Sequence, residues 1–285
     1  MILIIWIILV LLVIFFIYVI SKDLIKHKND LEDINPLKVA FIGFFVNFFD
    51  VLGIGAFAPQ TALLKFMKQT EDRVLPGTLN VSNTVPVLIQ ALIFIKIIEV
   101  EAITLISMLV SAAFGAIIGA GIVSRLPVKK IQITIGIALF VTAFFMISGQ
   151  MNWVEGGGEA IGLNGGKLVL ANVANFFLGA LMTAGIGLYA PCMALIYALG
   201  MSPLVAFPIM MGSCAFLMPP ASAKFIKKGA YNRKASLWMA IPGSVAVLIA
   251  ALMVKSLPIN ILRWIVIVVV IYTSIIMFRS ALKIK

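Results

Sequence analysis

The heptapeptide GIGAFAP at residues 53–59 returns 132 residues later as GIGLYAP at residues 185–191. Both copies lie within long apolar segments. Glycine weakens a helix, and proline removes a backbone donor and disfavours the helical conformation of the residue before it. We therefore predict that each copy interrupts a helix. Matched interruptions are the pattern by which membrane transporters build a binding site near the middle of the bilayer.

The composition excludes an ordinary soluble domain. The chain has 285 residues, of which 62% are hydrophobic and 12% charged, whereas soluble domains are about half apolar and a quarter charged. The net charge of +11 comes from Lys and Arg in short loops beside apolar spans. Such residues set the orientation of a membrane protein and do not form a nucleic-acid patch. We expect the lipid bilayer, and no nucleic acid, as a partner.

Residues suited to catalysis or metal binding are scarce. The single histidine, His27, lies in a charged loop, and the two cysteines, Cys192 and Cys214, lie in apolar segments. These residues form no catalytic triad, no cluster with metal-ligand spacing and no disulfide framework. We expect no enzymatic activity, no catalytic residues, no metal and no cofactor.

The apolar segments define the organisation. Residues 1–20 are wholly apolar, lack the features of a signal peptide and are long enough to cross a bilayer, so we predict a retained N-terminal transmembrane helix. A polar loop, 21–38, follows, and a Gly-rich stretch, 156–166, separates two halves. The other apolar segments are 39–68, 76–95, 102–124, 131–150, 168–200, 203–223, 236–254 and 261–278.

The two halves align at the same offset of 132 residues. Besides the heptapeptide, Pro76 matches Pro208 and Lys96 matches Lys228. Apolar composition alone does not produce matched Gly, Pro and Lys at one offset, so we predict a four-segment unit used twice. Residues 39–150 and 168–280 are the two copies, within one transporter domain of an all-α integral membrane protein.

The lengths and charges of these segments predict how they thread. Thirty helical residues would span about 45 Å, against a core of about 30 Å. If the two broken segments enter and return on one side, all but four of the 22 Lys and Arg residues face the inside. The four are Lys96, Lys167, Lys255 and Arg263. If both segments cross, eight face the outside.

The positive-inside rule therefore favours re-entrant segments. Each repeat then has a re-entrant segment followed by three transmembrane helices, and the second repeat is inverted. The N-terminus would lie outside and the C-terminus inside the cytoplasmic membrane. A parallel repeat of full spans is the alternative.

The broken segments suggest a site for a small anion. A helix start leaves backbone N–H groups unpaired and carries roughly half a positive charge. Pro59 and Pro191 suit the first position of a new helix. Two such starts that meet would attract an anion without Lys or Arg. The alternative is that Gly and Pro only kink two packed helices.

Polar residues near the breaks extend the candidate site. Asn80, Asn83 and Thr84 share one helix face, which must point into the bundle, toward substrate or toward another helix. Cys192 is interpreted as a packing residue rather than a reactive thiol. The candidate substrate-binding residues are Gly53, Gly55, Ala58, Pro59, Gln60, Thr61, Asn80, Asn83, Gly185, Gly187, Tyr189, Pro191, Cys192, Met193 and Ser213.

Asp50 is the only carboxylate within an apolar segment. Because a charge in the bilayer is costly, such residues usually serve function. Asp50 is our candidate for proton coupling, and a hydrogen-bonded structural role beside Asn47 is the alternative.

The chain resembles the sulfite exporter TauE/SafE family of membrane permeases. The resemblance rests on the duplicated Gly-Ile-Gly-x-Phe/Tyr-Ala-Pro element, on Pro76-Gly77-Thr78, and on the Leu-Pro element at 126–127 and 257–258. It implies transport of sulfite, sulfoacetate or another organosulfonate, and we expect a secondary transporter that works by alternating access in the direction of export. A channel-like anion conductor and a non-transporting accessory protein are the alternatives, and assembly into a homo-oligomer is left open.

Overall fold

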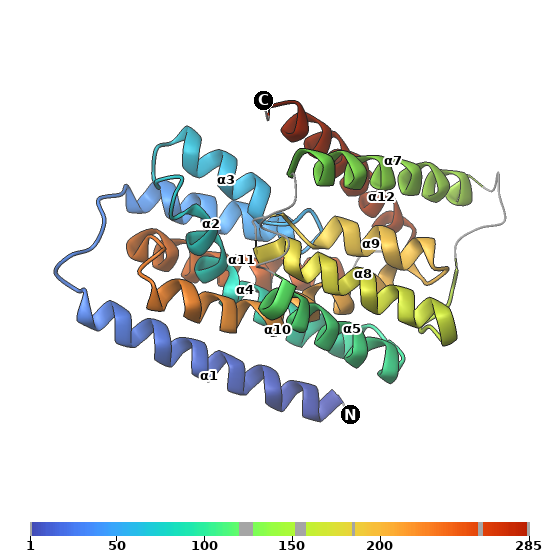
Figure 1. Cartoon of the computed structure of the whole chain (residues 1–285), viewed down its shortest axis with the longest axis horizontal. Coiled ribbons are helices and arrows are strands. Elements are labelled where there is room, and N and C mark those ends of the chain that lie inside the picture. Colours follow the sequence, from blue (N-terminus) through green and yellow to red (C-terminus); the bar gives the residue numbers. More distant parts are fainter. Residues whose placement is uncertain (1, 120–127, 152–157, 184–185, 256–258, 284–285) are drawn as a thin grey trace.

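The computed structural model describes residues 2–119, 128–151, 158–183, 186–255 and 259–283, which are almost entirely helical. Figure 1 shows the helices running roughly along the long axis of the molecule. The elements are α1 (Ile2–Lys26), α2 (Pro36–Asp50), α3 (Phe57–Phe66), α4 (Leu75–Ile97), α5 (Ala102–Phe114), a π-helical turn (Gly115–Gly119), α7 (Val128–Gln150), α8 (Gly165–Thr183), α9 (Tyr189–Ala198), a 3₁₀ turn (Pro203–Val205), α10 (Ala206–Lys227), α11 (Arg233–Lys255) and α12 (Ile259–Lys283).

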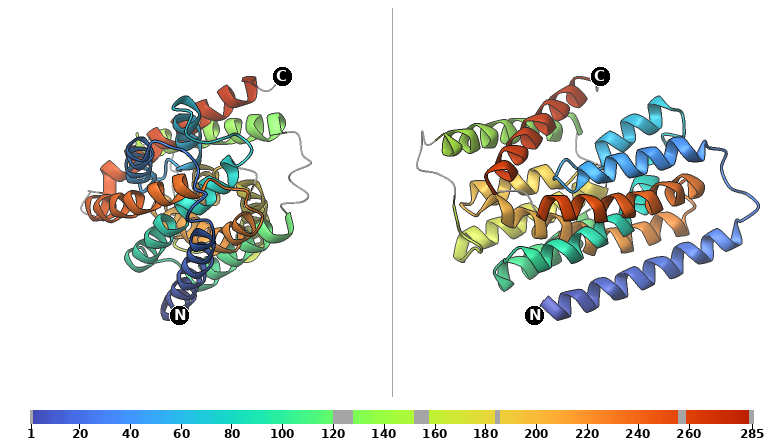
Figure 2. Two further views of the ribbon diagram at one scale, coloured as in Figure 1. Left: turned by 90° about the vertical axis from the view of Figure 1, so that its left-hand side faces the viewer. Right: turned by 180° about the vertical axis from the view of Figure 1, so that it is seen from behind.

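Five helices in the described part of the chain are long and apolar enough to cross a membrane. They cover residues 3–26, 75–97, 165–183, 203–227 and 233–253. This finding confirms an all-α membrane protein. The first helix, α1, continues six residues beyond the predicted end at residue 20, and it lies along one edge of the bundle against α10 and α4 (Figures 1 and 2).

The first interrupted segment turns back on itself. Asn35 caps α2 by accepting the N–H of Lys38 at 3.1 Å, and its own N–H donates to Oε1 of Gln69 at 2.7 Å. Gln69 follows α3, so the start of α2 lies beside the end of α3. The chain between the two helices, residues 51–56, is not helical. The predicted interruption is therefore confirmed, and the two helices form a hairpin.

The second interrupted segment, α8 and α9, has the same shape. Nζ of Lys167, near the start of α8, donates to the carbonyl of Leu199 at 3.2 Å, just after α9 ends. The N–H of Ser202 donates to the carbonyl of Ala160 at 3.0 Å. The start and the end of this hairpin are thus neighbours as well.

The two hairpins enter the bundle from opposite ends. Asn232 joins the first hairpin to the start of α4, because it binds Oγ1 of Thr78 at 2.9 Å and the carbonyl of Gln69 at 3.4 Å. Beyond the other end of α4, the N–H of Glu101 binds the carbonyl of Ile161, close before α8. In Figure 1 the outer ends of α2 and α3 lie to the left and those of α8 and α9 to the right.

The central helices are α4 and α10, which correspond to each other at the 132-residue offset of the sequence and pack against each other. Asn80, Asn83 and Thr84 on α4 are fully buried, which confirms that this polar face points into the bundle. Oγ of Ser222 on α10 lies 2.9 Å from Oγ1 of Thr84. Polar contacts as well as apolar ones therefore hold the two central helices together.

Small residues allow α5 and α8 to approach closely. A side chain at Gly115 would collide with the backbone of Phe176, and one at Gly179 would collide with the backbone of Ala112. The small residues of these helices therefore serve internal packing. Both cysteines, Cys192 and Cys214, are free and buried.

Candidate functional site

The turn between α2 and α3 depends on two glycines. Gly53 and Gly55 have φ angles of +91° and +84°, which other residues rarely adopt. Gly53 also approaches Met193 of α9 so closely that a Cβ would lie 2.6 Å from the methionine methyl group. Gly185, the equivalent of Gly53, lies outside the described residues. The first helix interruption is thus specified by glycine at two positions.

Both helix interruptions line one small pocket of about 30 Å³. The first interruption contributes residues between 54 and 59, and the second contributes residues between 187 and 190. Residues of α12 line the remaining side. The pocket is small, and most of the residues that line it are apolar. The pocket is lined by Ile54, Gly55, Phe57, Ala58, Pro59, Gly187, Tyr189, Ala190, Tyr272, Thr273, Ile276 and Met277.

The starts of α3 and α9 give this pocket a positive potential. Phe57 and Ala58 are the first two residues of α3, and Tyr189 and Ala190 are the first two of α9. Their N–H groups have no acceptor within their own helices. Neither helix has a side-chain cap. Each start carries roughly half a positive charge, and the Asp50 carboxylate, which accepts the N–H of Ala56, lies beside the start of α3.

The two prolines stand at the third position of their helices, not at the first as predicted. Each helix begins two residues earlier, at Phe57 and at Tyr189. Proline is tolerated there because no N–H in the first turn has an intrahelical acceptor, and no carbonyl four residues earlier belongs to the helix. Two residues with a backbone N–H therefore precede each proline in its helix.

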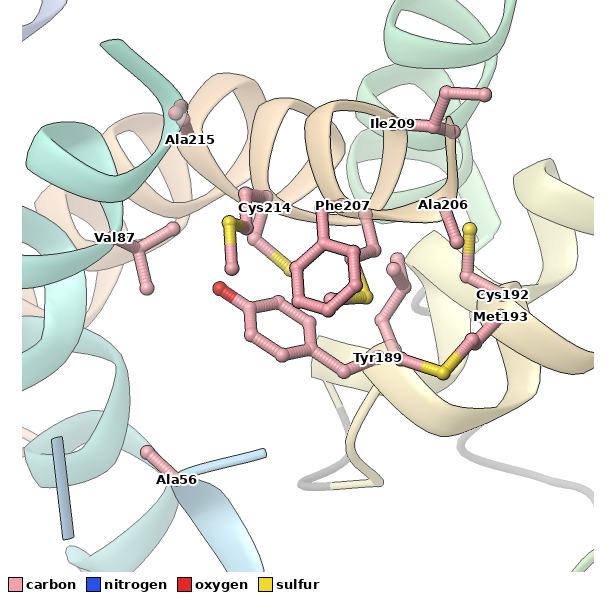
Figure 3. Packing of buried hydrophobic residues seen from close by; sticks show 14 of the residues in the cluster. Ala56, Val87, Tyr189, Cys192, Met193, Ala206, Phe207, Ile209, Cys214 and Ala215 are labelled. Atoms are coloured by element: carbon pink, nitrogen blue, oxygen red, sulfur yellow. The ribbon is translucent and has the colours of Figure 1, made fainter. Parts of the chain in front are cut away.

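A hydrogen-bonded chain connects the pocket to Asp50. The hydroxyl of Tyr189 donates to Oε1 of Gln90 at 2.8 Å, and Nε2 of Gln90 donates to Oδ2 of Asp50 at 2.7 Å. The backbone N–H of Ala56 also donates to the Asp50 carboxylate. All three side chains are buried. In Figure 3 the Tyr189 ring lies beside Phe207 and its hydroxyl points away from α9.

A comparison with known families decides what kind of protein carries this site. The sequence model of the family described as Sulfite exporter TauE/SafE matches residues 1–146, just over half of the chain. The chain belongs to the sulfite exporter TauE/SafE family. Membership implies a membrane permease for sulfite-type anions. No curated protein and no solved structure matches the chain. The match begins with α1 and ends within α7, four residues before Gln150.

Five of the candidate residues line the pocket of this TauE/SafE protein: Gly55, Ala58, Pro59, Gly187 and Tyr189. The structure thus brings residues from both copies of the heptapeptide to one place. Gly53 lies beside them in the same turn.

Several other polar candidates bind protein groups outside the pocket. Gln60 and Asn83 form a reciprocal amide pair with distances of 2.9 and 2.6 Å, and both are fully buried. Ser213 on α10 accepts from Nδ2 of Asn175 at 3.0 Å. Asn80 donates to the carbonyl of Pro76 in its own helix. In this conformation the Gln60–Asn83 and Asn175–Ser213 bonds join neighbouring helices, and none of the four candidates lines the pocket.

The remaining candidates do not line the pocket. Cys192 and Met193 are fully buried among apolar residues, as Figure 3 shows. Thr61 and Pro191 are half-buried and do not line the pocket. Asp50 accepts its hydrogen bonds at the end of α2, and Nδ2 of Asn47 binds the carbonyl of Gly43.

Sequence reasoning missed Gln90 and the contribution of α12. Gln90 is a polar residue deep in an apolar segment, and this position alone could have drawn attention to it. Tyr272 and Thr273 lie near the end of the chain, and no local pattern connects them with the heptapeptides.

Proposed function

We propose that the protein is a secondary transporter that exports a small sulfur-containing oxyanion, such as sulfite, sulfoacetate or another organosulfonate, across the cytoplasmic membrane. One observation carries this proposal. Two interrupted hairpins enter from opposite ends and place both helix starts at one pocket. A mobile sulfonate or sulfite oxygen is a natural acceptor for such N–H groups.

The two hairpins suggest an inverted repeat, with the binding site near the middle of the bilayer. In such proteins, alternating access comes from the movement of one repeat or bundle against the other around a fixed site. The pocket of about 30 Å³ would then belong to a closed conformation. Opening toward one side would separate the α3 start from its neighbours, and opening toward the other side would separate the α9 start.

The orientation follows from the positive-inside rule, with the N-terminus outside and the C-terminus inside. Export of an anion then runs with the membrane potential, which contributes about 2.3 kcal/mol per charge at 100 mV. Uptake would need a coupled cation.

Asp50 offers a route for coupling to protons. Its carboxylate accepts from the N–H of Ala56, directly before α3, and from Gln90, whose carbonyl oxygen accepts from Tyr189. An ionised Asp50 would oppose an anion in the pocket, whereas a protonated Asp50 would not. Binding of an anion and of a proton would therefore favour each other.

The test is flux in reconstituted proteoliposomes. Vesicles loaded with sulfite and placed in labelled sulfite should take up label by exchange, and the exchange should saturate with concentration. Flux that rises linearly and is not stimulated by substrate on the other side would indicate a channel. Absence of flux with sulfite, sulfoacetate and thiosulfate, in vesicles that contain folded protein, would contradict transport.

A further inference from the structure

A second pocket, of about 470 Å³, lies between the ends of α1 and α10, away from the helix interruptions. Its two walls are the last turn of α1 with His27 and the end of α10 with the residues up to Arg233. It shares no lining residue with the pocket at the interruptions. The basic residues that line it are Lys22, Lys26, His27, Lys227, Lys228 and Arg233.

The positive charge of this pocket is not neutralised from within. Asp23, the one carboxylate among its lining residues, accepts from Nε of Arg233 at 2.7 Å and from the hydroxyl of Tyr231 at 2.8 Å. His27 also contacts Asp23. Among the described residues, the four lysines form no ion pair. Their charge exceeds the partial negative charge of the helix ends at α1 and α10.

The pocket also has an apolar side that continues onto the surface of α1. Val19 and Ile226 line it together with the lysines. One turn further along α1, Phe15 and Tyr18 are 44% and 63% exposed. A ligand with a phosphate and acyl chains would match this arrangement, because the phosphate would meet the lysines while the chains run along α1.

We infer that this pocket binds the phosphate headgroup of an anionic phospholipid in the cytoplasmic leaflet. The inference rests on the orientation proposed above, which places the ends of α1 and α10 inside. Basic pockets between membrane helices on that side bind anionic headgroups. The transported anion fits less well, because the pocket flanks a helix outside the repeat. The bound lipid would fasten α1 to α10 beside the contact between Asp23 and Arg233.

The experiment measures the melting temperature of the whole protein in detergent with added short-chain phospholipid. Phosphatidylglycerol should raise the melting temperature, and phosphatidylcholine should not. The double variant Lys227→Gln/Lys228→Gln should bind phosphatidylglycerol about 30-fold more weakly. The matched control, Lys65→Gln/Lys68→Gln, removes two lysines that line a different pocket, and it should keep the full shift.

Three results would overturn the inference. One is an equal shift with phosphatidylcholine, and another is an undiminished shift in the Lys227/Lys228 variant. The third is the same shift with inorganic phosphate, which would indicate a site for a free anion. If the variant does not fold, the salt dependence of the wild-type shift decides, because a headgroup site weakens as ionic strength rises and an acyl-chain site does not. Loss of flux with an intact lipid shift would contradict transport alone.

Discussion

At the scale of single residues, the site depends on a buried polar chain drawn from three helices. Tyr189, Gln90 and Asp50 satisfy one another across α9, α4 and α2. A buried polar group without a partner is costly, so each member holds the others in place. This series of hydrogen bonds also connects the pocket at the helix starts to the carboxylate of Asp50.

Asp50→Asn tests whether this acidic residue couples transport to protons. We expect sulfite exchange to continue, because the amide can still accept from Gln90, while the dependence of net flux on a pH gradient disappears. The measurement is flux in proteoliposomes with imposed pH gradients. Asp30→Asn, in an exposed loop, is the control. A variant that retains the full rate and the full pH dependence would remove Asp50 from the mechanism.

Tyr189→Phe removes one hydroxyl and keeps the ring. It leaves Oε1 of Gln90 buried without its donor, which should cost about 1–3 kcal/mol in the free energy of unfolding. The melting temperature in detergent should fall clearly. Tyr18→Phe changes a tyrosine that is 63% exposed on α1 and should leave it unchanged. Equal melting temperatures for the two variants would show that the Tyr189 hydroxyl contributes nothing.

At the scale of the elements, the heptapeptide predicted the helix interruptions but not every residue position in them. The second helices were expected from residues 59 and 191, and they begin at Phe57 and Tyr189. Local rules cannot separate these choices, because proline fits several positions in a first turn. The role of Gln90 was not predictable either, since its partner Tyr189 is 99 residues away.

Three Gly→Ala variants compare how strongly three positions in the two turns require glycine. Gly53→Ala should be the most destabilising, because it has a positive φ and in addition requires the flexible end of the Met193 side chain to move aside. Gly55→Ala has room, so it should cost only the backbone strain of about 1–2 kcal/mol. Gly187→Ala has no atom within 4 Å and should be nearly neutral. Melting temperatures measure the order, and a Gly187 variant less stable than the Gly53 variant would contradict this account of the turn.

At the scale of the whole molecule, the composition and the apolar segments predicted an all-α membrane protein. The duplicated sequence and the loop charges add the prediction of an inverted repeat. The buried polar face of α4 and the all-helical fold were found as expected. The contacts between α12 and the two interruptions were not, because they join distant parts of the chain. A repeat indicates equivalent elements, but the side chains that fill the space between them are chosen by packing.

Cysteine accessibility tests the inverted topology. Thr70 follows the first hairpin and Ser202 follows the second. Cys192 and Cys214 are buried, so they should react slowly with a membrane-impermeant thiol reagent. We expect Ser202→Cys to be labelled in intact cells and Thr70→Cys only in inverted vesicles. Labelling of both from one side would refute the inversion.

The central claim is that the transported anion binds between the two helix starts. Anomalous diffraction from crystals grown with selenite, a heavier analogue of sulfite, tests it most directly. The account predicts one strong selenium peak between the two helix starts, with selenite oxygens within hydrogen-bond distance of the N–H groups of Phe57, Ala58, Tyr189 and Ala190. A peak elsewhere in the membrane region, or unbroken helices through both heptapeptides, would contradict it.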